Sequence, residues 1–280
     1  MLVKLPKDKT TIWQIKTGFG PIDMMCAEYY TQNFAKHSHD NFPLGVIEQG
    51  AMSFYFRRQN LVASKGTVNL SYPGEVHNGL ALGASGWKYR MFYFDLKILR
   101  QIFAEFKNRK SDLPFFPKGV IEDDYLASYL YRLHTALEEK QLTAMEIDTF
   151  IMQTISYMIL KHSDQNCHVE KSLAKHSGIQ MAQDYIISRC NEDISLSDVA
   201  RVVGLSPFHF SRLFLHQTGT SPHAFLIQAR IRKVRRLLFS NMPLADIALE
   251  VGFVDQSHLN RRFKQIFGVT PHQYRKIIQD

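Results

Sequence analysis

The N-terminal third of the chain alternates short apolar runs with turn residues. The runs are rich in β-branched and aromatic residues, and they are separated by glycines such as Gly50 and Gly66 and by the pair Pro73-Gly74. They occupy residues 25–30, 44–48, 52–56, 67–71 and 89–94. Many short strands with regularly spaced turns predict a small antiparallel barrel or jelly roll.

After residue 94 the apolar residues recur every three or four positions, which is the period of a helix. This spacing predicts a helix over 96–106, a second over 122–139 and a third over 143–162, where Thr143 and Glu146 form a capping box. The third helix has apolar residues on more than one face, so two of its sides need burial. The second side can lie inside one large domain or against a second subunit, and the pattern leaves both open.

The C-terminal third of the chain repeats itself. One set of positions recurs with an offset of 48 residues: Leu196, Asp198, Val199, Ala200, Val203, Gly204 and Leu205 correspond to Leu244, Asp246, Ile247, Ala248, Val251, Gly252 and Phe253. A second set has an offset of 49: Phe214, Gly219 and Pro222 correspond to Phe263, Gly268 and Pro271. Each copy therefore contains a helix, a glycine turn and a second helix, which is the pattern of a helix-turn-helix.

Local signals mark the ends of these helices. Ser195 and Asp198 are close to a capping box, Gly204 ends the first helix, and Ser206 before a proline begins the second. In the second copy Asp255 is the predicted N-cap. The sequence thus predicts two tandem motifs, each with a well-defined second helix.

The second helix of the second motif has an entirely polar outward face. Ser257, Asn260, Arg261 and Lys264 follow one another at helical spacing, and Gln256 flanks them. Arginine bonds guanine edges, asparagine and glutamine suit adenine, and lysine suits phosphate. A polar face is typical of any surface helix, but its place inside one of two matched motifs favours DNA recognition.

The charge of the chain is consistent with a nucleic-acid partner. The whole sequence has 34 Lys and Arg against 26 Asp and Glu, and residues 179–280 hold 13 against 8. A basic domain attracts phosphate without reading the bases. Five basic residues lie on a predicted helix over 223–239, between the motifs: Arg230, Arg232, Lys233, Arg235 and Arg236. We interpret this helix as a rigid spacer, and its charges can either contact phosphate or simply solvate the helix.

Residues 194–275 closely resemble the DNA-binding domain of the AraC/XylS family of bacterial transcription regulators. The matching stretches are ISLSDVARVVGLSPFHFSRLFLHQTGTSPHAFL and PLADIALEVGFVDQSHLNRRFKQIFGVTPHQYR. The resemblance implies base contacts from two groups: Phe208, Ser211 and Arg212 in the first motif, and Gln256, Ser257, Asn260 and Arg261 in the second. It also implies promoter DNA and RNA polymerase as partners, with activation as the usual outcome.

The first motif departs from the second in its polarity. Leu215 stands where the second motif has Lys264, and Phe208 is a large apolar residue at a predicted contact position. As an alternative to a polar base contact, Phe208 can make an apolar contact with the methyl group of a thymine.

Two histidine motifs in the predicted barrel resemble those of cupins. They are His37-Ser38-His39 and Pro73-Gly74-x-x-His77. In metal cupins such histidines bind a divalent ion together with a glutamate, but here that position falls near Pro43 or Leu44, and the next acid is Glu48. The resemblance to AraC-like sensor domains implies a small-molecule effector or no ligand, so we predict no metal and no cofactor. The candidate pocket residues are His37, His39, Tyr55, Arg57, Tyr72 and His77.

Several classes of protein are disfavoured. No apolar run is long enough to span a membrane, and the N-terminus lacks the apolar core of a signal peptide. Cys26, Cys167 and Cys190 have no CxxC spacing, which fits a reducing cytoplasm. No phosphate-binding glycine loop, nucleophile elbow or zinc-protease motif is present, so we do not expect an enzyme.

Together these features predict an α+β chain. A cupin-like antiparallel barrel with two dimerisation-type helices occupies residues 1–162, a polar linker 163–178, and an all-α domain with two helix-turn-helix motifs 179–280. We expect a homodimeric, effector-controlled transcription regulator in the cytoplasm. The alternatives are a metal-dependent cupin enzyme fused to a DNA-binding domain and a regulator without a ligand.

Overall fold

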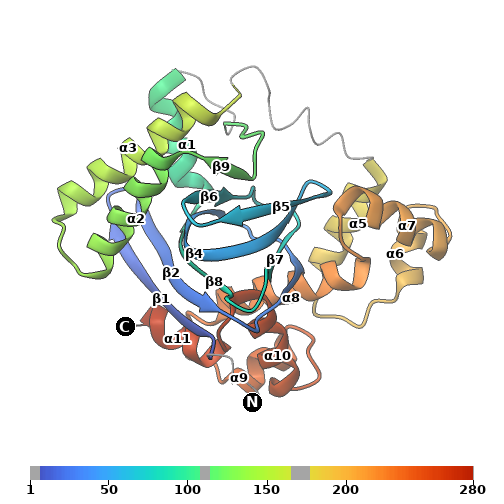
Figure 1. Cartoon of the computed structure of the whole chain (residues 1–280). Helices are drawn as coiled ribbons and strands as arrows, with labels where there is room; N and C mark the ends of the chain where they lie inside the picture. Colours follow the sequence, from blue (N-terminus) through green and yellow to red (C-terminus); the bar gives the residue numbers. More distant parts are fainter. Residues whose placement is uncertain (1–6, 108–113, 165–176, 280) are drawn as a thin grey trace, which may run out of the picture. The chain divides into compact units, whose positions relative to one another are not determined.

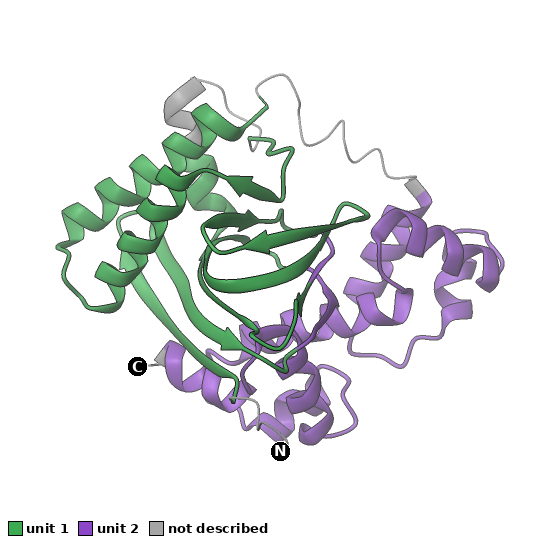
Figure 2. Cartoon of the chain, in the orientation of Figure 1, with its two compact units in different colours: residues 1–32, 39–74, 79–174 green, residues 33–38, 75–78, 175–280 purple. Residues whose placement is uncertain are grey.

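The computed structural model describes residues 7–107, 114–164 and 177–279. The chain divides into two compact units, shown in two colours in Figure 2. Unit 1 comprises Met1–Gln32, His39–Gly74 and Gly79–Ala174, and unit 2 comprises Asn33–Ser38, Glu75–Asn78 and Lys175–Asp280. Most of the predicted linker, residues 165–176, lies outside the described residues.

Unit 1 is built on an antiparallel sheet, as the alternating pattern of the sequence predicted. Its main path runs in the order β1-β2-β8-β4-β6-β9, with β5 and β7 paired to β4 (Figure 1). The short strand β3 belongs to unit 2 and pairs with β7, whose first residues belong to the same unit. The strands are β1 (Lys9–Thr17), β2 (Gly20–Tyr29), β3 (Phe34–His37), β4 (Phe42–Phe56), β5 (Gln59–Ser64), β6 (Thr67–Leu70), β7 (His77–Ala81), β8 (Trp87–Phe94) and β9 (Val120–Glu122).

The prediction of two separate strands around Gly50 was wrong, because β4 is one continuous strand of 15 residues. Its register shifts between Ile47 and Gln49, and Gly50 has a φ of 68°. A Cβ at Gly50 would lie 2.1 Å from the carbonyl oxygen of Gly86. This glycine therefore does not end the strand: it permits an irregularity that only a residue without a side chain can occupy.

One face of the sheet forms the core of unit 1. Met24, Phe92, Leu44 and Leu70 stand opposite one another on four neighbouring strands, and all four are fully buried. Because side chains alternate along a strand, this row and its neighbours face the same side. The helices α1 (Leu96–Lys107), α2 (Asp124–Glu138) and α3 (Ala144–His162) contribute to the same hydrophobic cluster. All three helices were predicted within a few residues of their observed ends.

Polar side chains join the beginning of α2 to the end of α3. Asp123 caps α2 by accepting a hydrogen bond from Leu126 N at 3.1 Å, and it also accepts from Tyr157 and His162 of α3. The Nζ atom of Lys161 lies 3.0 Å from the same carboxylate. Burial alone would raise the pKa of Asp123, but these donors outweigh burial and hold the pKa well below its usual range. The capping box of Thr143 and Glu146 begins α3, as predicted.

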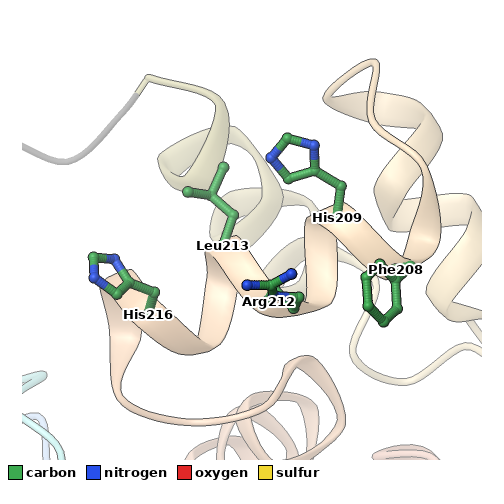
Figure 3. A pocket seen from close by; sticks show the side chains of 5 residues that line it. All are labelled: Phe208, His209, Arg212, Leu213 and His216. Atoms are coloured by element: carbon green, nitrogen blue, oxygen red, sulfur yellow. The ribbon is translucent and has the colours of Figure 1, made fainter.

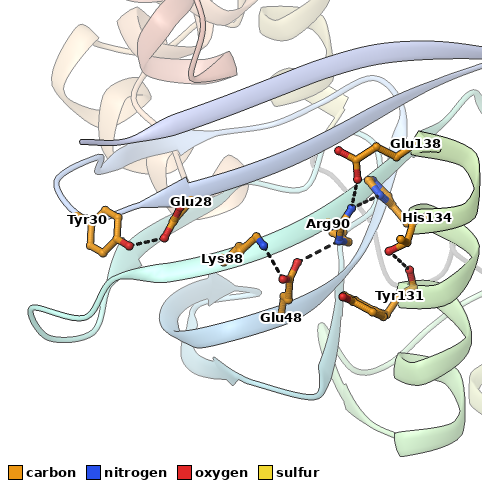
Figure 4. A network of polar contacts seen from close by, with 9 residues as sticks. Glu28, Tyr30, Glu48, Lys88, Arg90, Tyr131, His134 and Glu138 are labelled. Carbon is orange, nitrogen blue, oxygen red and sulfur yellow. Dashed lines mark hydrogen bonds and ion pairs between the residues drawn. The ribbon is translucent and has the colours of Figure 1, made fainter. Parts of the chain in front are cut away.

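A network of charges around the buried Arg90 ties α2 to the sheet (Figure 4). Arg90 of β8 is 7% exposed; it donates to Glu138 of α2 and, at 3.0 Å, to Glu48 of β4. Lys88 donates to the other oxygen of Glu48. Because the guanidinium has a carboxylate partner on each side, its burial beside the apolar core is compensated.

His134 of α2 completes this network as a neutral imidazole. Its Nε2 donates to Met25 O at 3.1 Å, and its Nδ1 accepts from Arg90 Nη1 at 3.2 Å. Burial, and then the nearby positive charge of Arg90, lower the pKa of His134 to about 3. Protonation would remove the acceptor that faces Arg90 and place two cations side by side.

We predict that His134 makes the protein acid-sensitive. In the unfolded chain a histidine titrates near 6.5, so between pH 6.5 and about 3 the unfolded state binds a proton that the folded state does not. The free energy of unfolding should therefore fall as the pH drops through this window. The variant His134→Gln keeps one amide donor and one oxygen acceptor but cannot titrate. Its thermal midpoint should depend less steeply on pH than that of the natural protein, and parallel curves would contradict the assignment.

Unit 2 contains the repeated helical part of the chain. Its helices are α5 (Ser177–Ser188), α6 (Leu196–Val202), α7 (Pro207–Thr218), α8 (Pro222–Leu237), α9 (Leu244–Glu250), α10 (Gln256–Phe267) and α11 (Pro271–Gln279). Helices α6 and α7 form the first predicted motif, and α9 and α10 the second. Phe210 and Phe214 of α7 and Leu259 and Phe263 of α10 are fully buried, as the repeat predicted.

Candidate functional site

The second helices of the two motifs, α7 and α10, begin and end in the same way. Ser206 caps α7 by accepting from His209 N at 3.3 Å, and Asp255 caps α10 by accepting from His258 N at 2.6 Å. Both helices end at a left-handed glycine, with φ of 75° at Gly219 and 74° at Gly268. These local signals were all visible in the sequence, and they fix which residues of each helix face outward.

The outward face of α10 carries the predicted recognition residues of the second motif. Gln256, Ser257, Arg261 and Lys264 are exposed. Asn260 is half-buried, and its Oδ1 atom is buried without a hydrogen-bond partner among the described residues. Four of the five predicted groups are therefore accessible, and the carboxamide oxygen of Asn260 is not.

Two residues that flank this face are engaged with each other on α10 itself. Arg262 donates to His258 Nε2 at 3.3 Å and to Gln265 at 3.2 Å. Burial, followed by the charges of Arg262 and Arg261, lowers the pKa of His258. A neutral His258 is the form that accepts the bond from Arg262, so this pair stiffens the helix beside the exposed Arg261.

The outward face of α7 is more apolar, as the sequence indicated. Phe208 is 73% exposed and Leu215 51% exposed, and the guanidinium carbon of Arg212 lies 5.7 Å from the Phe208 ring centroid. Ser211, the third predicted contact, is half-buried. Stacking of Arg212 on Phe208 presents a flat aromatic surface and a cation together.

A hollow with a volume of about 440 Å³ lies along α7 (Figure 3). The residues that line it are Phe208, His209, Arg212, Leu213 and His216. His209 and His216 were not among the predicted contacts. Their spacing of seven places them on one side of the helix, and this signal could have been read from the sequence.

The basic residues of α8 connect the two motifs. Arg230 donates to the carbonyl oxygens of Cys190 and Glu192 at 2.7 and 3.0 Å, before the first motif. Lys233 donates to Glu250 at the end of α9. Arg235 donates to the Tyr274 hydroxyl of α11 at 2.8 Å. At least three of the five basic side chains therefore bond to the protein itself. The sequence had suggested only that these charges solvate the helix or contact phosphate.

Gly252 of the second motif lies close to the segment before the first motif and to α8. A Cβ at this position would lie 2.8 Å from the carbonyl oxygen of Asn191 and 3.1 Å from the guanidinium of Arg230. Gly252 has a φ of 89°, so the position excludes other residues by conformation as well as by space. This contact and the bonds of α8 tie the second motif to α8 and to the segment before the first motif.

The six predicted pocket residues fall into separate groups. Arg57 lies over the ring of Phe115 at 4.5 Å and donates to Phe116 O and Pro117 O. The Tyr72 hydroxyl donates to Pro114 O and accepts from Phe116 N. These two residues hold the segment 114–117. Tyr55 is half-buried on β4, opposite Asn60 of β5.

His37, His39 and His77 are all buried. The ring centroids of His37 and His77 are 4.6 Å apart, and the His39 ring meets the Tyr93 ring edge-on at 5.6 Å. Burial lowers the pKa of His37 to about 4. Burial, and then the neighbouring His37, lower the pKa of His77 to about 3. His37 and His77 are therefore neutral at physiological pH.

Comparison with known proteins agrees with this arrangement. Residues 20–155 match the AraC-like ligand binding domain, and residues 199–277 match a helix-turn-helix domain. The chain belongs to the AraC family of transcriptional regulators. Its N-terminal part is the ligand-binding domain and its C-terminal part binds DNA.

Curated relatives support the same family. An uncharacterized HTH-type transcriptional regulator of Bacillus subtilis, YbfI, is 27% identical over 229 residues, which cover 81% of this chain and 82% of YbfI. The regulatory protein PocR of Salmonella typhimurium is 29% identical over 144 residues, which cover 50% of this chain and 48% of PocR. The family assignment therefore rests on both the sensor and the DNA-binding parts.

Solved structures of similar fold cover nearly the whole chain. ToxT from Vibrio cholerae O395 superposes with a TM-score of 0.52 at 11% identity, covering 97% of this chain and 98% of ToxT. ToxT with a bound unsaturated fatty acid gives a TM-score of 0.52 at 14% identity, covering 97% of this chain and 95% of ToxT. At this identity the likeness concerns the fold. Among the described helices, none combines the length and the hydropathy needed to cross a membrane.

We predict that Arg261→Ala weakens binding to a cognate DNA site by about 1–3 kcal/mol, the cost of one good base contact. Arg261 is exposed on the polar face of α10, and its loss leaves the buried Leu259 and Phe263 in place. Binding to cognate and to random DNA is measured by fluorescence anisotropy at one salt concentration.

The matched control is Arg189→Ala, because Arg189 is an exposed arginine outside both motifs. It should lower both affinities slightly and equally. An equal loss on both DNAs for Arg261→Ala would reduce Arg261 to a phosphate contact, and no loss on either would remove it from the interface.

Proposed function

We propose that this regulator is a homodimeric activator that reads promoter DNA with α7 and α10 and responds to a small molecule in its N-terminal domain. The observation that carries the proposal is the pair of capped helices with outward polar or aromatic faces. They are connected by α8, which bonds to the segment before the first motif and to α9 of the second. Arg261 and Lys264 supply guanine and phosphate contacts in the second motif. Phe208 and Arg212 supply an apolar and a cationic contact in the first.

In this proposal α8 sets how far apart the two helices read the DNA. Two helices of one subunit that enter the major groove from the same side contact segments about 10 base pairs apart. Arg230, Lys233 and Arg235 bond α8 to its neighbours on both sides, so the separation of the helices is not free to vary.

We predict that inserting five base pairs between the two contacted segments reduces binding to the level of a single motif. Such an insertion turns the second segment by half a turn of the duplex, about 180°. Footprinting of the full chain on the natural and the lengthened site measures protection of each segment. A site whose spacer keeps its length but changes its sequence serves as the control and should be bound as before. Equal protection on the lengthened site would show that the motifs act independently.

The homodimer proposal rests on the outer surface of α3. Met145, Met152 and Leu160 are 80%, 41% and 62% exposed, although the other apolar residues of the helix pack into unit 1. Their spacing of seven and eight places them along one stripe of the helix. Burial of three large apolar side chains in a subunit contact removes this surface from water.

We predict that Met152→Glu and Leu160→Glu each weaken dimerisation of the full chain by about tenfold or more, because each buries a carboxylate in an apolar contact. The control is Gln153→Glu, which adds the same charge at a neighbouring exposed position. Sedimentation equilibrium measures the dissociation constants. A natural protein that stays monomeric at high micromolar concentration would refute the dimer, and equal weakening by the control would point to net charge rather than to the stripe.

The inner face of the sheet favours a polar effector. Asn69 and Ser71 lie on the other face of the sheet from the buried Leu70. On that face Asn69 is paired with Gly45 of the neighbouring strand, and Gly45 is paired in turn with Met91. Asn69 is 4% and Ser71 1% exposed, and Asn69 Oδ1 and Ser71 Oγ have no hydrogen-bond partner among the described residues. Buried polar atoms usually find a partner, so a ligand with hydrogen-bonding groups fits this face better than an alkyl chain alone.

Activation through RNA polymerase is proposed from the family resemblance. The matching relatives are named as regulators, and we propose no enzymatic reaction for this chain. A role in the cytoplasm, where the promoter lies, completes the proposal.

A further inference from the structure

A short strap, residues 114–117, contacts the chain at the start of the predicted linker. Phe115 and Asp164 form an antiparallel β-bridge, in which Asp164 N donates to Phe115 O at 2.7 Å. Asp164 is the last residue described before α5. The preceding end of α3 is fixed separately, because Asp123 accepts a hydrogen bond from His162 at 2.7 Å. The bridge to the strap therefore orients Asp164 and with it the start of the linker.

Two side chains from elsewhere in unit 1 hold the strap. The Tyr72 hydroxyl donates to Pro114 O and accepts from Phe116 N, the latter at 2.8 Å, and the Tyr72 ring stacks on that of Phe115. Arg57 lies over the Phe115 ring and donates to Phe116 O at 3.3 Å. Tyr72 and Phe116 are 5% and 2% exposed. Loss of the hydroxyl would therefore leave buried backbone groups without their partner unless the strap opened.

The backbone at Arg57 indicates that this contact is maintained at a cost. Arg57 and Arg58 form the two-residue turn between β4 and β5, and their φ angles are 46° and 69°. Turns of this kind strongly favour asparagine and glycine, because both central residues adopt positive φ. A glycine at position 57 would relieve the strain but would lose the guanidinium group over Phe115. Strain that the surrounding contacts maintain in this way points to a conformational role for the strap.

One short stretch of chain connects the strap to the polar groups on the other face of the sheet. Asn69 and Ser71 lie on the face for which we proposed a polar effector, and Leu70 and Tyr72 alternate with them and belong to the core cluster. Leu70 N donates to Gly119 O at 3.0 Å, just after the strap, and Tyr72 holds the strap itself. A shift of this stretch toward or away from a ligand therefore moves the groups that hold the strap.

We propose that the strap is a latch that transmits the state of this polar face to the linker. When the stretch that carries Asn69 and Ser71 is restrained, Tyr72 keeps the strap closed and the strap holds Asp164. When that stretch loosens, the strap opens and the start of the linker is released. A ligand that binds one of these two states better shifts their populations. The latch rests on the proposed polar effector, because that effector is what restrains Asn69 and Ser71.

Opening of the latch is measured as hydrogen exchange of the Asp164 amide in the full chain, resolved by NMR. Tyr72→Phe removes both bonds of the hydroxyl, so this amide should exchange faster by about tenfold or more. Arg57→Gly should act in the same direction, although it relieves a strained turn. The matched control is Lys140→Gly, at an exposed lysine with a φ of 54° just after the end of α2, and it should leave the exchange unchanged.

The connection to the polar face is tested by a double-mutant cycle that needs neither effector nor DNA. Asn69→Leu removes a buried amide oxygen that has no hydrogen-bond partner among the described residues, so it should restrain this face. It should slow exchange of the Asp164 amide by about threefold or more in the natural background and have no effect in the Tyr72→Phe background. The Gly18 amide, which donates to Asp148 Oδ1 at 2.8 Å in the same unit, is the internal reference and should not change.

Three results would overturn the latch. The first is unchanged exchange at Asp164 in Tyr72→Phe and Arg57→Gly, and the second is an equal acceleration at the Gly18 amide, which would mean a general loss of stability. The third is an equal effect of Asn69→Leu in both backgrounds. A failure of the effector proposal shows separately, as the absence of any small molecule that raises the thermal midpoint of the natural protein.

Discussion

The reading of DNA by this protein depends on how α8 is fixed between the two motifs. Arg230 bonds to carbonyl oxygens before the first motif, Lys233 bonds to α9 of the second motif, and Arg235 bonds to α11, which follows that motif. Arg230 donates hydrogen bonds to two carbonyl oxygens, and Arg235 donates one to the Tyr274 hydroxyl. Such directional bonds orient a guanidinium group more strictly than an exposed ion pair would. Arg230, Lys233 and Arg235 of this helix therefore have a structural use, and in the proposed function the phosphate contacts come mainly from the two recognition helices.

In the N-terminal domain the two faces of the sheet carry different sets of residues. Residues such as Leu44, Leu70 and Phe92 face the helices and make an apolar core, and Asn69 and Ser71 alternate with them and face the other way. Because the side chains of a strand alternate with period two, the two faces of the sheet differ in composition. The face of Asn69 also carries the buried Met25, Ile47 and Met91, so its polar groups lie in a largely apolar surrounding. The charges of Arg90, Glu48 and Glu138 lie at the edge of the core, where they lock α2 without interrupting it.

Sequence patterns predicted those parts of the structure whose signals are local. The N-caps Ser206 and Asp255, the capping box at Thr143 and the glycines that end the recognition helices depend on residues within one turn, and all were confirmed. The continuous β4 was not predicted, because Gly50 reads as a turn until the strands that pair on both of its sides are known.

Contacts between distant residues were also beyond the sequence. Nothing in its spacing places Arg57 and Tyr72 against the segment 114–117, or Arg230 against Cys190. For the candidate DNA contacts, periodicity identified the outward faces, but it could not show that the oxygen of Asn260 is buried.

The two recognition helices share one backbone design but differ in chemistry, and this difference has an energetic meaning. In the proposed complex, the exposed Arg261 and Lys264 of α10 exchange water for DNA, and directional bonds from Arg261 to base edges penalise a wrong base strongly. On α7 the exposed Phe208 gains by leaving water whichever base it meets, and it discriminates only through contact with a methyl group. In this proposal α8 fixes the distance between the two helices. The position that α10 takes on the DNA by reading its bases therefore also sets the position of α7. Specificity can thus reside mainly in α10 while α7 adds affinity at a defined place.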